Sequence, residues 1–326
     1  MSTGQSVVVI TEKFDPHADV LVRMLQARHV PVFRINTGTF NADHAVAMTL
    51  DGIRVEDRFG RSIDFPSGVR SVWHRKPTEP IGPEADLEAR RFNSGETQEA
   101  LNFFSSDRRP LWVNNPNDNR VAQRKYPQLC LATELGLRVP RSLITNDVAR
   151  AQAFFASCPG GVICKSLKES GYEKDGVTFH VFTRRVDEAE FTALKGSIAA
   201  CPTYFQEYVP KKFELRITVI DRQIFCCQLD SQAHEETLID WRKGDVEKMK
   251  HTIVPLPAKV GDALCAMLER YDLRFGTFDF VLTPEDEYVF LELNPNGQWY
   301  WIEMLTGAPM AEAMAALLSN GTPRGR

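Results

Sequence analysis

Two short apolar runs near the C-terminus constrain the fold of this chain more than any other feature. Thr277–Leu282 and Tyr288–Asn294 are rich in strand-forming residues, and the segment between them, Thr-Pro-Glu-Asp-Glu, has the composition of a turn. This pattern predicts a β-hairpin. The second run is followed at once by Pro295-Asn296-Gly297, a tight polar loop.

The predicted hairpin carries three oxygen-bearing side chains. Glu292 and Asn294 are two residues apart and therefore share a face, and Asp279 lies in the middle of the partner strand. For any one of them alone, a solvated polar face would be the simpler explanation. Two carboxylates and an amide oxygen converging beside a polar loop indicate instead a site for Mg²⁺ that carries a nucleotide phosphate.

Composition excludes several classes of protein. The chain has 326 residues, enough for one large or two to three small domains, and its net charge of −4 gives no sign of a nucleic-acid-binding surface. No apolar run approaches the roughly 20 residues of a membrane-spanning helix, and the N-terminus has no signal-peptide pattern. The seven cysteines form no CxxC pair, which is typical of a reduced, cytoplasmic protein without structural zinc.

The first third alternates strand and helix signals. Ser6–Thr11, His17–Arg28 and Val30–Ile35 form a βαβ pattern, which predicts a parallel sheet in an α/β domain over residues 1–116. Further expected elements there are strands at 47–50, 53–57, 69–73 and 111–116 and a helix over 83–106.

The rest of the chain is expected to form two more domains, 117–203 and 204–326, so that an α/β first half precedes an α+β second half. In the first of these we expect helices over 119–136 and 147–157, with Asp147 as N-cap, and strands at 139–145 and 161–167. In the second we expect strands at 203–209, 215–220 and 223–229, the hairpin, and helices over 258–271 and 309–318.

Four features within and between these elements carry candidate chemistry. Lys165 ends an apolar run, where it either reaches water or contacts a phosphate, and Lys125 is a weaker candidate of the same kind. The loop 169–176 has two glycines and forms either a hairpin turn or a lid over phosphates. Gln206-Glu207-Tyr208-Val209 precedes a proline, so its main chain can serve as a hinge that holds a base.

Two arginines are candidates for binding anions. Glu214 and Arg216 share a strand face; they form either an ion pair or a set in which Glu214 accepts from ribose and Arg216 binds a carboxylate or acyl phosphate. Arg242 follows Trp241 and is a second candidate clamp.

In this order, these features resemble the ATP-grasp superfamily over residues 115–305. The resemblance implies an ATP-grasp fold with an N-terminal βαβ (pre-ATP-grasp) domain, and ATP with Mg²⁺, two ions, as cofactors. It assigns Lys125 and Lys165 to phosphates, Glu207, Tyr208 and Val209 to adenine, and Glu214 to ribose. Arg242 would reach the γ-phosphate, Arg216 and Arg242 would be catalytic, and Asp279, Glu292 and Asn294 would bind the metal.

Segments 34–40, 72–77 and 139–146, together with Ile239-Asp240-Trp241-Arg242, resemble the graspetide (microviridin-type) ribosomal peptide ligases. Such enzymes activate Asp or Glu side chains of a precursor peptide as acyl phosphates, which Ser, Thr or Lys side chains attack to form ω-esters or ω-amides. The resemblance implies a precursor peptide with a leader and an acidic, hydroxyl-rich core as partner, and a homodimer. The strip 177–195 is a candidate leader-binding surface.

The sequence also offers candidate substrate contacts. His74, Arg75, His234 and Trp241 are candidates, and His234 or Glu235 could accept the proton of the nucleophile; a packed or capping histidine is the alternative for His74. Two other functions use the same residues. One is a RimK-like carboxylate–amine ligase that adds amino acids to a peptide or protein, and the other is a non-catalytic, nucleotide-gated peptide-binding scaffold.

Overall fold

The N-terminal part is a parallel sheet with a helical layer, as the βαβ pattern predicts. The computed structural model describes residues 5–82, 86–168, 171–174, 177–180, 182–233 and 235–323. The strand order is β2-β1-β6-β7, and every pairing is parallel. The elements are β1 (Ser6–Thr11), α1 (Pro16–Ala27), β2 (Val32–Asn36), β6 (Val69–His74) and β7 (Leu111–Val113).

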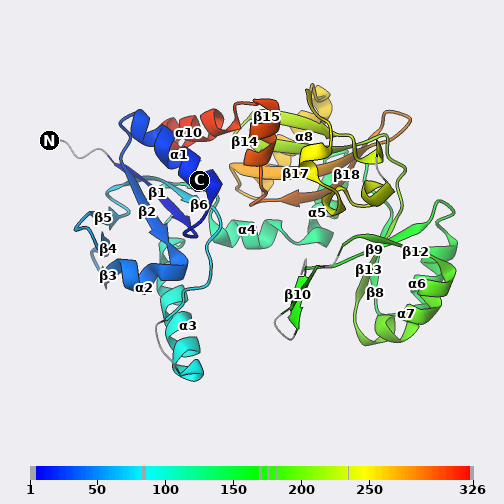
Figure 1. Ribbon diagram of the computed structural model, residues 1–326, viewed down its shortest axis with the longest axis horizontal. Coiled ribbons are helices and arrows are strands. Elements are labelled where there is room, and N and C mark those ends of the chain that lie inside the picture. Colours follow the sequence, from blue (N-terminus) through cyan, green and yellow to red (C-terminus); the bar gives the residue numbers. More distant parts are fainter. Residues whose placement is uncertain are drawn as a thin grey trace.

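A small antiparallel sheet and a long helix extend this domain away from the rest of the molecule (Figure 1). The sheet pairs β3 with β4 and β4 with β5. Strand β5 was not among the predicted elements, and it has only four residues, with alternating exposure. The elements are η1 (Thr37–Thr39), α2 (Phe40–Asp43), β3 (His44–Thr49), β4 (Gly52–Asp57), β5 (Ser62–Phe65) and α3 (Leu87–Phe104).

Two helices, not one, lead from this domain to the rest of the chain. The expectation of one helix over 119–136 is wrong: α4 (Pro116–Ala122) and α5 (Lys125–Glu134) are separate. Arg124, between them, has extended backbone angles (φ −75°, ψ 112°), which interrupt the helical hydrogen bonds. Asn115 caps α4 by accepting from the Asn117 N–H, and Pro116 occupies the first turn.

The central part is an antiparallel sheet of order β12-β9-β13-β8 with α6 and α7 on one side (Figure 1). Asp147 caps α6, as expected. Helix α7 was missed, although Asp187 and Glu190 form a capping box at its start. The elements are β8 (Ser142–Thr145), α6 (Val148–Ala156), β9 (Val162–Lys165), the separate hairpin β10 (Gly171–Lys174) and β11 (Val177–His180), β12 (Arg184–Val186), α7 (Glu188–Ala200) and β13 (Thr203–Glu207).

The C-terminal part is a five-stranded antiparallel sheet of order β16-β15-β14-β17-β18. One face packs on α5 and α8. The other packs on α9, α10 and the N-terminal domain, so α10 lies beside α1 (Figure 1). The elements are β14 (Phe213–Ile220), β15 (Gln223–Leu229), η2 (Ser231–Ala233), η3 (Glu235–Thr237), η4 (Trp241–Lys243), η5 (Val246–Lys248), β16 (His251–Val254), α8 (Ala258–Arg270), β17 (Phe275–Leu282), β18 (Tyr288–Asn294), α9 (Tyr300–Thr306) and α10 (Met310–Asn320).

The described helices give no candidate for a bilayer-crossing segment, since none is both long and apolar enough. The domain limits at 116 and 203 remain predictions.

Candidate active site

One cavity of about 1040 Å³ gathers nearly all of the predicted site residues. Its walls come from the end of β6, from α4 and α5, and from the central and C-terminal sheets. The predicted residues that line it are Arg75, Lys125, Lys165, Glu207, Tyr208, Val209, Glu214, Arg216, Trp241, Arg242, Asp279, Glu292 and Asn294.

An arginine and two acids form a row across three neighbouring strands. Arg216 on β14 lies opposite Asp279 on β17, and Asp279 lies opposite Glu292 on β18. Side chains directly opposite each other point to the same face of a sheet. Arg216 Nη1 donates to both carboxylate oxygens of Asp279, at 2.8 Å each. The row therefore holds two carboxylates and a guanidinium at the floor of the cavity.

A β-bulge shapes this floor. The register of β17 and β18 shifts after Asp279, so Leu291 is an extra residue on β18 without a counterpart on β17. Both Leu291 and Glu292 line the cavity as a result. Leu291 packs with Val209 and Val281, which gives one end of the cavity an apolar wall beside the acidic floor.

The two acids differ in their electrostatic surroundings. Burial, together with the adjacent Glu292 carboxylate, raises the pKa of Asp279. Burial by itself would also raise the pKa of Glu292, but Lys125, Lys165, Arg242 and Arg216 together leave that pKa lowered. A charged Glu292 carboxylate beside the buried Asp279 carboxylate is a favourable setting for a divalent cation.

The donor set fits Mg²⁺. Across the described residues, no group of three or more His, Cys, Asp or Glu side chains could hold a metal ion. The pair of carboxylates needs further oxygen ligands, and the Asn294 amide at the end of the same strand can supply one. Asn294 Oδ1 accepts from the Asn296 N–H at 3.0 Å, which fixes its orientation.

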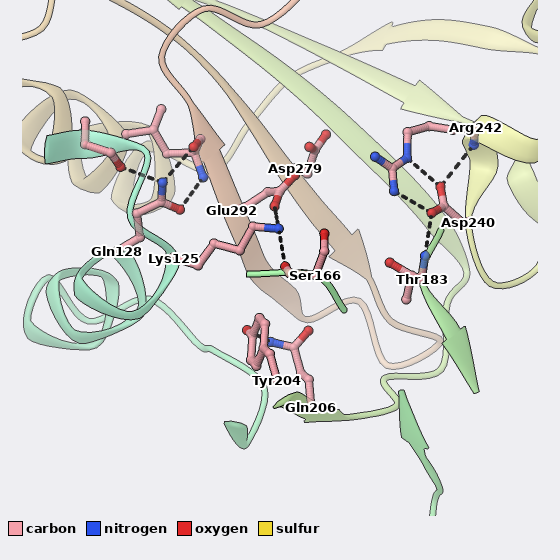
Figure 2. Close-up of polar contacts among 12 residues, drawn as sticks. Lys125, Gln128, Ser166, Thr183, Tyr204, Gln206, Asp240, Arg242, Asp279 and Glu292 are labelled. Atoms are coloured by element: carbon pink, nitrogen blue, oxygen red, sulfur yellow. Dashed lines mark hydrogen bonds and ion pairs between the residues drawn. The ribbon is translucent and has the colours of Figure 1, made fainter. Parts of the chain in front are cut away.

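Two lysines face the acids from the opposite wall. Lys125 Nζ lies 3.4 Å from Glu292 Oε2 and donates to the Ser166 carbonyl at 3.0 Å (Figure 2). Burial lowers the pKa of Lys165, at the end of β9, to about 8. Both ammonium groups lie where a polyphosphate above the acids would be neutralised.

The predicted hinge lies at the apolar end of the cavity. The Glu207 N–H donates to Arg141 O and the Tyr208 N–H to Gly161 O, both at 2.9 Å. Among the described residues, none accepts a hydrogen bond from the Val209 N–H. The hinge main chain can therefore offer that donor to a base.

Gln206 is a site residue that sequence analysis did not assign individually. It is fully buried, its Nε2 donates to the Tyr204 hydroxyl at 2.8 Å, and its Oε1 has no partner within the described part of the chain (Figure 2). Because Gln206 also lines the cavity, this oxygen can accept from an exocyclic amino group.

Glu214 is held by a lysine that was also missed. Lys211 Nζ donates to Glu214 Oε1 at 2.7 Å and to the Ile239 carbonyl at 2.8 Å. Burial raises the pKa of Glu214 in spite of this pair. Glu214 keeps its second carboxylate oxygen for a hydroxyl donor, which agrees with the expected ribose contact.

Arg242 is fixed by the preceding acid. Its Nε and Nη2 donate to Asp240 at 2.8 and 2.5 Å, and the Thr183 N–H donates to the same carboxylate at 3.2 Å (Figure 2). The hydrogen bonds that Arg242 donates to Asp240 raise the pKa of Arg242 above its usual value. Asp240 thus orients a permanently charged guanidinium that borders the cavity.

The N-terminal domain closes the cavity at the loop after β18. Arg75 is 2 % exposed and donates to the Asn296 carbonyl at 2.8 Å. A Cβ on Gly297 would lie 2.8 Å from Arg216 Nη2 and 1.6 Å from Thr277 Oγ1, so only glycine fits there. This loop therefore packs directly against the Arg216 row.

One predicted substrate residue, His74, is not among the residues that line the cavity. Burial lowers the pKa of His74 to about 4, as for a packed histidine. His234 lies outside the described residues. Glu235, in η3, is not among the lining residues. An aromatic wall was partly missed: Trp301 lies beside Trp241, with ring centroids 5.5 Å apart.

Comparison with known proteins agrees with this geometry. No protein-family model matches the chain, and no curated protein matches it in sequence. A RiPP-associated ATP-grasp ligase from Chryseobacterium gregarium, solved with ADP and a leader and core peptide, has a TM-score of 0.90 at 26% identity over 98% of both chains. Macrocyclase MdnC from Microcystis aeruginosa, bound to precursor peptide MdnA, has a TM-score of 0.85 at 25% identity, over 98% of this chain and 100% of MdnC. Macrocyclase MdnB from the same organism has a TM-score of 0.78 at 28% identity, over 97% of this chain and 100% of MdnB.

The fold and the site together define an ATP-grasp ligase. The similarity to graspetide ATP-grasp ligases that the sequence indicated is confirmed by these solved structures.

Proposed function

We propose that this chain is an ATP-dependent macrocyclase of a ribosomally made precursor peptide. The observation that carries the proposal is the cavity itself. It is lined by an apolar site for a nucleotide base, two lysines, an acid pair and two fixed arginines. The similar enzymes in which a precursor or a leader and core peptide is bound span the same length as this chain.

The nucleotide would lie along the cavity from the hinge to the acids. Leu291, Val209 and Val281 would cover the adenine faces, while the Gln206 oxygen and the Val209 N–H would meet its polar edge. Lys125 and Lys165 would contact the phosphates. Asp279, Glu292 and Asn294 would hold Mg²⁺, two ions, whose charge neutralises the phosphate oxygens.

The chain's own residues would contribute to catalysis by positioning the substrates and by stabilising charge. A substrate carboxylate oxygen forms a bond to the γ-phosphorus as the bond to ADP breaks, giving an acyl phosphate. A Ser or Thr hydroxyl, or a Lys amine, then attacks the acyl carbon, inorganic phosphate leaves, and the nucleophile loses a proton. Arg216 and Arg242 would stabilise the charge on the transferred group from two sides.

The other two functions make different predictions. A RimK-like ligase would use the same phosphate and metal residues and would differ in its acceptor pocket. A non-catalytic scaffold has no need of the complete set of lysines, arginines and acids that the cavity retains. We therefore prefer the macrocyclase, acting in the cytoplasm as a homodimer on a leader-bearing peptide with an acidic, hydroxyl-rich core.

The test is mass spectrometry of a candidate precursor, encoded beside this gene, after incubation with the protein, ATP and Mg²⁺. A macrocyclase removes one water per crosslink and releases one ADP with each. A mass gain equal to an amino acid would replace our proposal with the RimK-like ligase. Nucleotide binding without any mass change or ADP release would support the scaffold instead.

A further inference from the structure

The cavity is strongly positive although the chain is negative. Ten lysines and arginines and five aspartates and glutamates line it, whereas the whole chain has a net charge of −4. A concave site with one sign of charge concentrates oppositely charged ligands. The cationic residues are Arg75, Lys76, Arg120, Arg124, Lys125, Lys165, Lys168, Lys211, Arg216 and Arg242.

Most of these cations already have a function or a partner within the site. Lys211 pairs with Glu214, Arg216 with Asp279 and Arg242 with Asp240. Lys125 and Lys165 serve the phosphates, and Lys76 lies 3.1 Å from Glu12.

Arg120 and Arg124 differ from the others. Both are exposed and line the cavity, and no ion pair joins either guanidinium to an acid in the part of the chain that the structure describes. Gln123 lines the cavity between them, so this short segment presents two guanidinium groups and a neutral amide, with no acid.

The position of this segment is fixed at both ends. Before Arg120, Asn119 Nδ2 donates to Asn296 Oδ1 at 3.1 Å, beside the carbonyl that Arg75 contacts. After Arg124, Lys125 reaches Glu292 at 3.4 Å. The two arginines therefore lie on the wall that connects the N-terminal domain with the phosphate lysines, along α4 and the start of α5 (Figure 1).

We propose that Arg120 and Arg124 form a second anion subsite, which takes an acidic side chain of the peptide substrate other than the one being activated. The inference rests on the proposed function, because it names what the same cavity recognises. Neither the nucleotide with its metal nor the carboxylate being activated supplies a negative charge to Arg120 and Arg124. A peptide with several acids supplies the missing charge and is thereby aligned with the next carboxylate near the phosphates.

The experiment uses a fluorescein-labelled synthetic peptide with repeated Gly-Ser-Glu-Glu units and a matched peptide with Gln in place of Glu. Binding is measured by fluorescence anisotropy, with the phosphate site saturated by Mg²⁺ and a non-hydrolysable ATP analogue. The variant is Arg120→Gln with Arg124→Gln. The control is Arg23→Gln, since Arg23 is an exposed arginine on α1 that does not line the cavity.

The Glu peptide should bind the wild-type protein and the Arg23 variant equally, and the double variant about fivefold to tenfold more weakly. The Gln peptide should bind all three proteins equally weakly. In the charge-reversed variant Arg124→Glu, the Glu peptide should bind more weakly than it binds the double variant, because the new carboxylate repels it.

Equal binding of the Glu peptide to the wild type and the double variant would overturn the subsite, as would its failure to bind the wild type. The affinity for the ATP analogue is measured in every variant and should not change. If the wild-type protein does not bind the ATP analogue, that result counts against the proposed function. Failure of the subsite and failure of the proposed function therefore give different results.

Discussion

Glu292 is the residue on which the charges of the cavity converge, since it faces Lys125 and lies opposite Asp279. We predict that Glu292→Gln, which keeps the shape and removes the charge, lowers the rate of ADP release by at least about a hundredfold. The melting temperature should stay within a few degrees of the wild type. The matched control is Asp286→Asn in the turn of the same hairpin, where Asn tolerates the φ of +60°. A Glu292→Gln rate within tenfold of the wild type would contradict the metal assignment.

Lys165 gives the site a pH dependence. Burial lowers its pKa to about 8, so the free protein loses this ammonium charge as the pH rises through that value. A bound phosphate favours the protonated form, and nucleotide affinity should therefore be constant below about pH 7.5 and fall toward tenfold weaker at one unit above the pKa. Calorimetric titration of ADP with Mg²⁺ from pH 7 to 9.5 measures this. Lys165→Arg, which stays charged, should remove the dependence, and an unchanged pH profile in that variant would exclude Lys165 as its source.

Asp279, Glu292 and Lys165 could be proposed as metal and phosphate residues from sequence because each is a polar residue in an apolar strand, where its presence needs an explanation. Gln206 and Lys211 could not be assigned in the same way. Their importance depends on an unmatched buried oxygen and on a contact with Glu214, which arise only when separate elements pack together. His74 shows the opposite case: its place beside Arg75 suggested a substrate contact, but of these two residues it is Arg75 that lines the cavity, and the contact of His74 stays a prediction.

At the scale of the element, the loop after β18 must approach Arg216 without a side chain in between. Gly297→Ala would place a Cβ 1.6 Å from Thr277 Oγ1, so the loop has to move away from the Arg216 row. We predict a loss of turnover of about tenfold or more and a loss of stability of about 1–3 kcal/mol.

The comparison for this prediction is Gly95→Ala, on α3, where nothing lies within 4 Å of the added Cβ. Because alanine is the better helix former, that variant should gain about 0.5–1 kcal/mol with no change in turnover. Chemical denaturation and ADP release distinguish the two glycines. Equal effects at both positions would show that the close approach of Gly297 is unimportant.

Elements themselves were predictable where apolar spacing is regular, as in β1, α8 and the hairpin. The bulge at Leu291 could not be found, because one extra residue in a strand leaves the composition unchanged. The break between α4 and α5 did have a signal in the sequence. Pro127 has no N–H to donate to the Gln123 carbonyl of a continuous helix, and it lies instead in the first turn of α5.

At the scale of the whole molecule, the C-terminal helix connects the first and last domains. Met310, Met314 and Leu318 of α10 are fully buried in a cluster that also contains residues of β1, α1 and β14. In addition, the Ser71 hydroxyl donates to the Leu318 carbonyl at 2.8 Å. The predicted domain limit at 116 therefore divides the chain only along its sequence, because in space the C-terminal helix packs on the N-terminal domain.

This packing predicts the result of truncation. A variant that ends at Pro309 lacks α10, and each buried Leu or Met side chain that it loses contributes about 2 kcal/mol, so the total rivals the net stability of about 5–15 kcal/mol expected for a domain. We expect this variant to lose cooperative thermal unfolding, with the exposed faces of β1 and β6 making it prone to aggregate. A variant that lacks only 324–326 should unfold like the wild type, because the ion pair and carbonyl contact of Arg274 with Asp221 and Thr322 are kept. If the protein that ends at Pro309 still unfolds cooperatively and binds nucleotide, the N-terminal domain does not depend on α10, and the two ends of the chain are energetically independent.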